Sequence, residues 1–147
     1  MSTRRQAREV ALQILYQLDL QEQLSAHQAV HLVIDHFRDP DEQEGVSLDG
    51  DALEFTESLV AGVQSQLVAI DAAITAASRN WRLERMARVD RNLLRLAVYE
   101  LHHAVEVPPK VAINEAIEIA KRFGTAESPA FINGILDRCL TALPRKA

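Results

Sequence analysis

Three arginines and a tyrosine near the amino terminus are the residues best suited to binding a charged ligand. Arg4, Arg5 and Arg8 open a predicted helix over about Thr3 to Leu20, and Tyr16 lies on the same helix. Cations at a helix amino terminus oppose the helix dipole, at roughly a few tenths of a kcal/mol each. This unfavourable placement indicates a use such as phosphate binding. The alternatives are that the arginines only solvate a fraying end and that Tyr16 is a ring at the core edge.

Other candidates for chemistry are weak. His27 and His31 have the i,i+4 spacing of metal ligands, but no third ligand accompanies them, so a solvated surface is favoured over a zinc site. His102 and His103 lie near a predicted helix end, where they favour the dipole rather than catalysis. The five glycines and one cysteine form no phosphate loop, nucleophile elbow or Cys-x-x-Cys motif. The sequence therefore predicts a binding or assembly protein, not an enzyme, with no metal and no cofactor.

The net charge of −5 is unevenly distributed along the chain. Residues 1–18 carry a balance of +2, residues 19–78 of −11 and residues 79–95 of +4. The overall acidity argues against a protein that binds nucleic acid through bulk charge. The separate basic segments still permit a local contact surface.

Length and composition predict one cytoplasmic domain. A chain of 147 residues can bury a hydrophobic core without disulfides or structural metal ions. The single Cys139 lies on an apolar helical stripe, which excludes a disulfide within the chain and indicates a reducing compartment. There is no apolar run of 18 residues and no signal peptide, so no contact with a membrane is expected.

Apolar periodicity predicts an all-α chain with six or seven helices. After the first helix, Ser25 and Gln28 form a capping-box pattern that opens a second. Breakers and acidic residues predict a loop over 38–50, and the longest helix is expected from Asp51 to about Ala77, with a break near Gln64–Gln66 left open. Asn80-Trp81-Arg82 is expected to start a short connecting helix, and Asp90 to cap or open the next one.

The carboxyl-terminal stretch predicts two helices joined by a tight turn. Pro109 suits the first turn of one helix, and Gly124 is expected to stop it in a left-handed cap. Ser128 is expected to be the N-cap of the second helix, with Pro129 in its first turn. Gly134 interrupts that helix, either to permit close approach of another backbone or as a mere weak spot.

Four segments, in the same order from end to end, resemble the NusB family of bacterial transcription antitermination factors. They are Arg4–Glu9 with Ala11–Tyr16, Val89–Leu101, Val111–Lys121 and Phe131–Asp137. The resemblance implies two helical bundles packed across each other within a single NusB-like domain. The first three helices, about residues 1–78, would form one bundle, and the rest, about residues 79–147, the other.

The same resemblance implies a function in transcription. Members of the family pair with NusE, a small-subunit ribosomal protein, and the pair binds the boxA element of nascent RNA. The assembly makes RNA polymerase resist termination, chiefly on ribosomal RNA operons. The expected partners are therefore single-stranded boxA RNA, NusE and the RNA polymerase antitermination complex.

The resemblance also carries site residues to positions in this chain. Those expected to face RNA are Arg4, Arg5, Arg8, Tyr16, Lys110, Glu127, Ser128 and Phe131, and Asp90 matches an acidic position facing NusE. Phe131 also heads an apolar stripe, so a core role stays open. Gln6 and Ala130 stand where the family's most basic members carry cations, which puts the RNA affinity in doubt.

Two other functions compete with this expectation. A NusB-like domain also precedes a methyltransferase domain in certain ribosomal-RNA cytosine methyltransferases, although this sequence does not continue into a glycine-rich cofactor domain. Some family members also dimerise and hide their arginines. The sequence leaves open the free oligomeric state, the RNA register and whether NusE must bind first.

Overall fold

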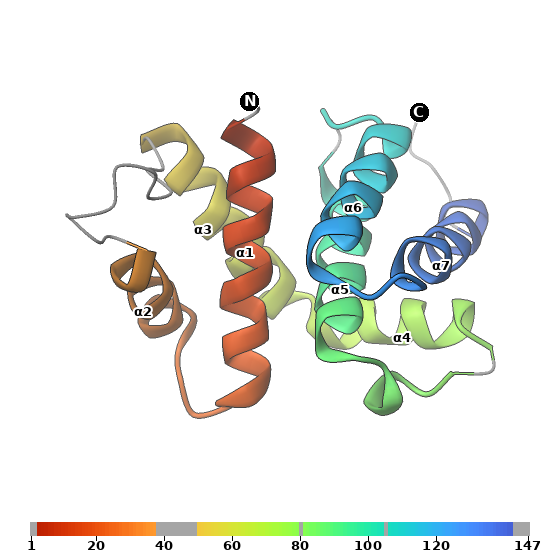
Figure 1. Cartoon of the computed structure of the whole chain (residues 1–147), viewed down its shortest axis with the longest axis horizontal. Coiled ribbons are helices and arrows are strands. Elements are labelled where there is room, and N and C mark those ends of the chain that lie inside the picture. Colours follow the sequence, from red (N-terminus) through yellow and green to blue (C-terminus); the bar gives the residue numbers. More distant parts are fainter. Residues whose placement is uncertain (1–2, 38–49, 80, 105, 143–147) are drawn as a thin grey trace. The chain divides into compact units, whose positions relative to one another are not determined.

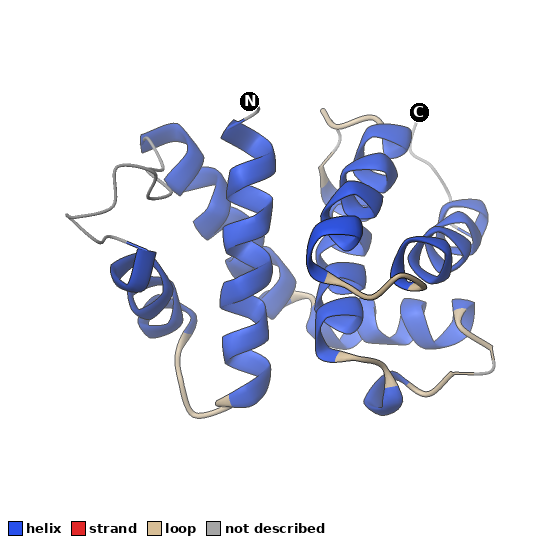
Figure 2. Cartoon of the chain, in the orientation of Figure 1, coloured by secondary structure: helices blue, strands red, loops and turns tan. Residues whose placement is uncertain are grey.

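The described part of the chain is almost entirely helical, as the sequence predicts (Figure 2). The structure, a computed structural model, describes residues 3–37, 50–79, 81–104 and 106–142. Within these ranges lie seven α-helices and one short 3-10 helix, η1, and no strand (Figure 1). Their bounds are α1 Thr3–Leu20, α2 Ala26–Phe37, α3 Gly50–Ser65, α4 Leu67–Ala77, η1 Leu83–Arg85, α5 Arg88–His103, α6 Pro109–Phe123 and α7 Ser128–Ala142. The expected loop over 38–50 lies outside the described residues, except for Gly50, which begins α3.

The chain divides into two compact units between Gln64 and Ser65. The first unit contains α1, α2 and α3 up to that division, and the second contains α4 to α7 with η1. Because α4 packs on α5 and α7, it belongs to the second unit, whereas the sequence analysis places the boundary near residue 78.

The predicted single helix from Asp51 to Ala77 is wrong, and the break considered near Gln64–Gln66 is confirmed. Helix α3 ends at Ser65 and α4 begins at Leu67, with Gln66 between them outside both helices. The apolar pattern hides this break because each helix buries its own stripe. Those stripes include Val60 and Val63 in α3 and Ile70 and Ile74 in α4.

The first unit is built around α1, whose bounds match the predicted ones. One apolar stripe of α1 is buried, namely Ala7, Val10, Ala11, Ile14, Leu15 and Leu18. The predicted capping box opens α2, because the Gln28 N–H donates to Ser25 Oγ at 3.1 Å and the Ser25 N–H donates to Gln28 Oε1 at 2.9 Å. In α3, Thr56 Oγ1 donates to the Ala7 carbonyl at 3.3 Å and so ties α3 to α1.

The second unit is organised around α5, which packs on α4, α6 and α7. Its buried stripe includes the predicted Leu93, Leu94, Ala97 and Val98. Arg95 joins α5 to α4 through a paired contact with Asp71, with Nε 2.8 Å from Oδ1 and Nη2 3.0 Å from Oδ2. Two parallel charge-assisted bonds of this kind fix direction as well as distance.

The predicted connecting helix is shorter and starts later than expected. Asn80 lies outside the described residues, Trp81 and Arg82 lie before the helix, and only the single 3-10 turn of η1 forms. Helix α5 then begins at Arg88, so Asp90 stands in its first turn and is not its cap. In the described residues, no single helix is long and apolar enough to cross a membrane; α3 and α4 meet that criterion only when taken together.

His102 should make the fold less stable at acidic pH. Burial lowers the pKa of His102 below its usual 6.5, and the charge of the neighbouring His103 lowers it further. The Nε2 atom of His102 is buried and has no hydrogen-bond partner among the described residues. Below about pH 6.5, His102 binds a proton in the unfolded chain more readily than in the folded chain. The free energy of unfolding should therefore fall as the pH drops through about 6.5. Urea unfolding across this range should give a flatter pH dependence for His102→Asn than for the wild type, and equal dependences would contradict this role.

Candidate nucleic-acid interface

In the first unit, two of the expected RNA-binding arginines share one aromatic ring. The guanidinium carbon of Arg4 lies 4.5 Å from the centre of the Phe55 ring in α3, and that of Arg8 lies 5.4 Å from it. Arg4 is exposed and Arg5 is half-buried, but only 3% of the Arg8 surface is exposed. Phe55 therefore holds the arginines on α1 through cation–π contacts.

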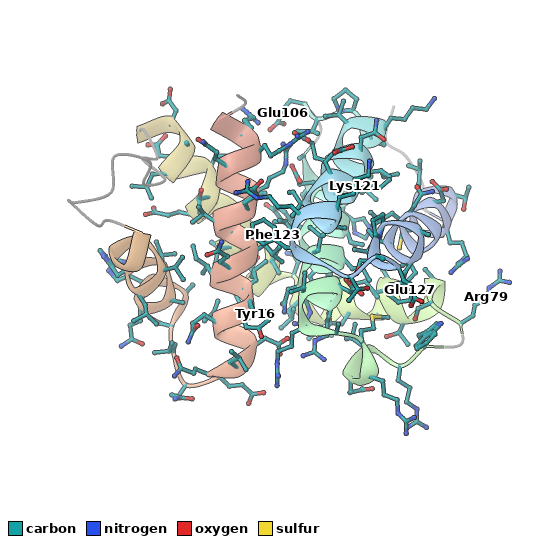
Figure 3. The ribbon with its side chains drawn as sticks, in the orientation of Figure 1. Tyr16, Arg79, Glu106, Lys121, Phe123 and Glu127 are labelled. Atoms are coloured by element: carbon teal, nitrogen blue, oxygen red, sulfur yellow. The ribbon has the colours of Figure 1, made fainter. Side chains whose placement is uncertain are left out.

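For the exposed Arg4, such a contact leaves the edge of the guanidinium accessible to a ligand. A guanidinium that stacks on a ring uses its face, while its N–H donors point outward in the plane and match the oxygens of a phosphate. Tyr16 lies further along α1 and is half-buried (Figure 3). The sequence alone does not single out Phe55, because the contact joins residues far apart in the chain.

In the second unit, Gly124 ends α6 in a conformation different from the predicted one. Its φ of −93° and ψ of −167° are extended, so the expected left-handed cap is wrong. The glycine is required for space instead. A Cβ at this position would lie 2.5 Å from Ser128 Oγ and 2.9 Å from the carbonyl oxygen of Ala120, closer than a Cβ approaches non-bonded atoms in proteins.

Ser128 shapes the loop between α6 and α7 rather than capping α7. It is the first residue of α7 and not the residue before it, and its Oγ accepts a hydrogen bond from the Thr125 N–H at 2.9 Å. The Ser128 N–H donates to the Thr125 carbonyl at 3.1 Å, and the Glu127 N–H donates to Thr125 Oγ1 at 3.3 Å. The N-cap expectation is therefore wrong, although Pro129 does lie in the first turn as predicted.

The expected RNA-facing residues of this hairpin differ in accessibility. Glu127 is exposed in the loop (Figure 3), Phe131 is half-buried and Ser128 is only 1% exposed. The Phe131 ring meets the indole of Trp81 edge to face, with ring centres 5.8 Å apart. A Phe131 ring that is partly accessible and held by a second ring can both pack and offer a face to a base.

Lys110 lies far from the hairpin loop, and Asp90 lies in the first turn of α5. Lys110 is exposed in the first turn of α6, so roughly 20 Å of helix separates it from the loop at the other end. Asp90 is half-buried, and its Oδ1 has no hydrogen-bond partner within the described residues. A carboxylate oxygen left in this state favours a cationic partner.

No group of three or more potential metal ligands occurs among the described residues. The His27 and His31 rings pack edge to face, with centres 4.5 Å apart. Cys139 is buried on the α7 stripe, and burial raises the pKa of its thiol.

Comparison with known proteins assigns the family. The model of the NusB family matches residues 5–141. The chain belongs to the NusB family. A transcription antitermination protein NusB from Geotalea daltonii is 49% identical over 99% of both chains. The relative is thus a regulatory protein, and the prediction that this chain is not an enzyme is confirmed.

Solved structures support the same NusB fold. The chain is similar to a structure of T. maritima NusB with a TM-score of 0.84 and 35% identity, over 97% of this chain and 93% of that one. It also matches a chain in a crystal structure of the antitermination factors NusB and NusE in complex with dsRNA. That match has a TM-score of 0.82 and 24% identity over 97% of this chain and 99% of that one, which bears on the fold alone. The all-α fold class is therefore confirmed.

Proposed function

We propose that this protein is a transcription antitermination factor that pairs with NusE and binds the boxA element of nascent ribosomal RNA. The observation that carries the proposal is the 49% identity to a transcription antitermination protein over almost the whole of both chains. The family to which the chain belongs includes a NusB that was solved with NusE and dsRNA, and this membership supports NusE and RNA as the kinds of partner. Since the factor would act on RNA as it is transcribed and join the RNA polymerase antitermination complex, it is expected in the cytoplasm.

The proposed RNA contacts combine charge and stacking. The guanidiniums of the exposed Arg4 and the half-buried Arg5 would bind phosphates, while the nearly buried Arg8 packs beside Arg4 on the Phe55 ring. Tyr16 is a half-buried ring on the same helix that could stack on a base. Sequence-specific RNA recognition usually takes unpaired strands by this combination of cations and rings.

The hairpin loop is the second proposed RNA contact. Phe131 offers part of a ring, and the exposed carboxylate of Glu127 can accept hydrogen bonds from base amino groups while repelling phosphates. Ser128 acts by fixing the loop, because its hydroxyl is already bonded to Thr125. Lys110 is a lesser candidate, since it lies at the far end of α6.

A binding assay with RNA tests this function. The chain, alone and with NusE, is titrated with a boxA oligonucleotide and with a scrambled one of the same length and composition. We expect preference for boxA, with tighter binding when NusE is present because NusE adds contact surface. Equal binding of the two oligonucleotides under both conditions would contradict the proposal.

Asp90 is proposed to contact NusE. Asp90→Lys should weaken the pairing by about tenfold or more, because it replaces a carboxylate, whose Oδ1 has no hydrogen-bond partner in the described residues, with a cation of opposite charge. Co-elution from a gel-filtration column and calorimetric titration measure the effect. Glu106→Lys makes the same charge change at an exposed position and serves as the control. If Asp90→Lys pairs as well as this control, Asp90 lies outside the interface.

Self-association is the remaining alternative for the free protein. A homodimer could cover the arginines of α1 and would then compete with RNA. Light scattering over a concentration series separates monomer from dimer, and added boxA RNA should shift any dimer toward the RNA-bound monomer.

A further inference from the structure

An exposed tryptophan adjoins the hairpin contact but has no role in the proposed function so far. Trp81 is the only tryptophan of the chain, and 58% of its surface is exposed between α4 and η1. Its indole contacts the Phe131 ring edge to face. An indole held at the surface with one face accessible is typical of a binding site, because the large apolar ring gains most from being covered.

The backbone around Trp81 holds the ring in place before any ligand binds. The Trp81 N–H donates to the Ser78 carbonyl at 3.0 Å, and Ser78 Oγ donates to the Trp81 carbonyl at 2.9 Å. Ser78 itself is 2% exposed, and Arg138 Nε donates to the adjacent Ala77 carbonyl at 2.6 Å. A turn fixed on both sides loses little conformational entropy when a ligand docks.

The indole is surrounded in sequence by cations that the described part of the chain does not neutralise. Exposed arginines occupy positions 79, 82, 85 and 88, with Glu84 as the one acid between them. None of these four guanidiniums forms an ion pair with another described residue. Arg79 projects away from the ribbon (Figure 3) and has a φ of +35°, a strained conformation for a side chain of this size.

We propose that Trp81 with Arg79, Arg82 and Arg85, the Trp81 platform, is a further contact for unpaired RNA. A base stacks on the indole next to Phe131, and the arginines bind the neighbouring phosphates. The inference rests on the proposed function, because Phe131 is one of the residues proposed to face boxA. Stacking platforms flanked by cations bind single strands with little sequence preference, so this contact would take nucleotides that flank boxA. An acidic protein could bind the arginines but would not need the face of the indole, so the combination of the two favours RNA.

The single tryptophan supplies a direct test. The NusE-bound chain is titrated with boxA RNA that carries unpaired nucleotides at either end, and tryptophan emission is followed against Trp81→Phe as the blank. Stacking should quench the emission of Trp81. Trp81→Ala should weaken binding of the extended RNA by roughly tenfold, whereas Trp81→Phe, which keeps a ring, should retain most of the affinity. The double variant Arg82→Gln, Arg85→Gln should lower the salt slope by about 1.4.

Controls separate this proposal from the proposed function. Lys121→Gln removes an exposed cation that is paired with Glu118 on α6, and it should leave both affinity and slope unchanged. If boxA binds but the emission stays constant and Trp81→Ala binds the extended RNA normally, the platform is wrong and the proposed function stands. If boxA RNA binds no better than the scrambled RNA, both the Trp81 platform and the proposed function are wrong. If NusE alone quenches the emission of Trp81 in the absence of RNA, the surface binds a protein and the RNA contact is wrong. If Trp81→Ala does not fold, the emission titration against Trp81→Phe and the salt slope of the Arg82→Gln, Arg85→Gln variant still decide the test.

Discussion

Gly124→Ala is expected to lower the free energy of unfolding by about 1–3 kcal/mol, the usual range for overpacking. The backbone at this residue, with φ of −93°, is accessible to alanine, so conformational strain is not the reason. The added methyl would instead lie 2.6 Å from the Ser128 Cβ and 2.9 Å from the Ala120 carbonyl oxygen. Because Ala120 O is part of the helix backbone, it cannot move aside cheaply. Urea unfolding followed by circular dichroism measures the loss.

Gly134→Ala is the matched control on the other helix of the hairpin. A Cβ at Gly134 would meet only the flexible end of Arg138, 3.9 Å away, so the expectation of close backbone approach is wrong and the weak spot is the correct alternative. The substitution should therefore stabilise the protein by up to about 1 kcal/mol through helix propensity. Equal effects of the two alanines, in either direction, would contradict the packing explanation for Gly124.

The helices follow from the sequence where their signals are local. The bounds of α1 and the capping box of α2 were predicted because apolar period and cap residues lie within a few positions of each other. The start of α6 at Pro109 follows for the same reason. The break at Gln66 was left open, since both sides keep the helical period and only the packing of α4 on α5 and α7 separates them.

The positions of the candidate site come from the resemblance and stay a prediction, whereas the contacts among its side chains could not be predicted from the sequence. The resemblance pointed to Arg4, Arg8 and Phe131, yet their neighbours Phe55 and Trp81 come from distant parts of the chain. No periodicity encodes such pairs, because each side chain also fits a plain surface or core role in its own helix. The hydroxyl of Ser128 was misassigned for a related reason: a serine before a proline suits an N-cap, and only the folded loop shows that it bonds to Thr125 instead.

Removing the charge of Arg4, Arg5 and Arg8 is expected to have the largest effect on RNA binding. Because Arg4 and Arg5 are the proposed phosphate ligands, the triple change to glutamine should lower the slope of log affinity against log salt by about 1.4, at roughly 0.7 per phosphate for single strands. The affinity for boxA should fall most at low salt, where the released counterions contribute most. Titrations of boxA with the NusE-bound chain at several salt concentrations measure both quantities.

The burial of Arg8 decides how the three arginines must be tested. Because its guanidinium lies over Phe55 and its surface is 3% exposed, Arg8→Gln removes packing as well as charge. The double variant Arg4→Gln, Arg5→Gln keeps the buried Arg8 in place and should account for the change in slope of about 1.4. Phe55→Leu keeps the charges and an apolar side chain but removes the ring, so it should lower affinity while leaving the slope intact. A double variant with the wild-type slope would exclude the start of α1 from the RNA surface.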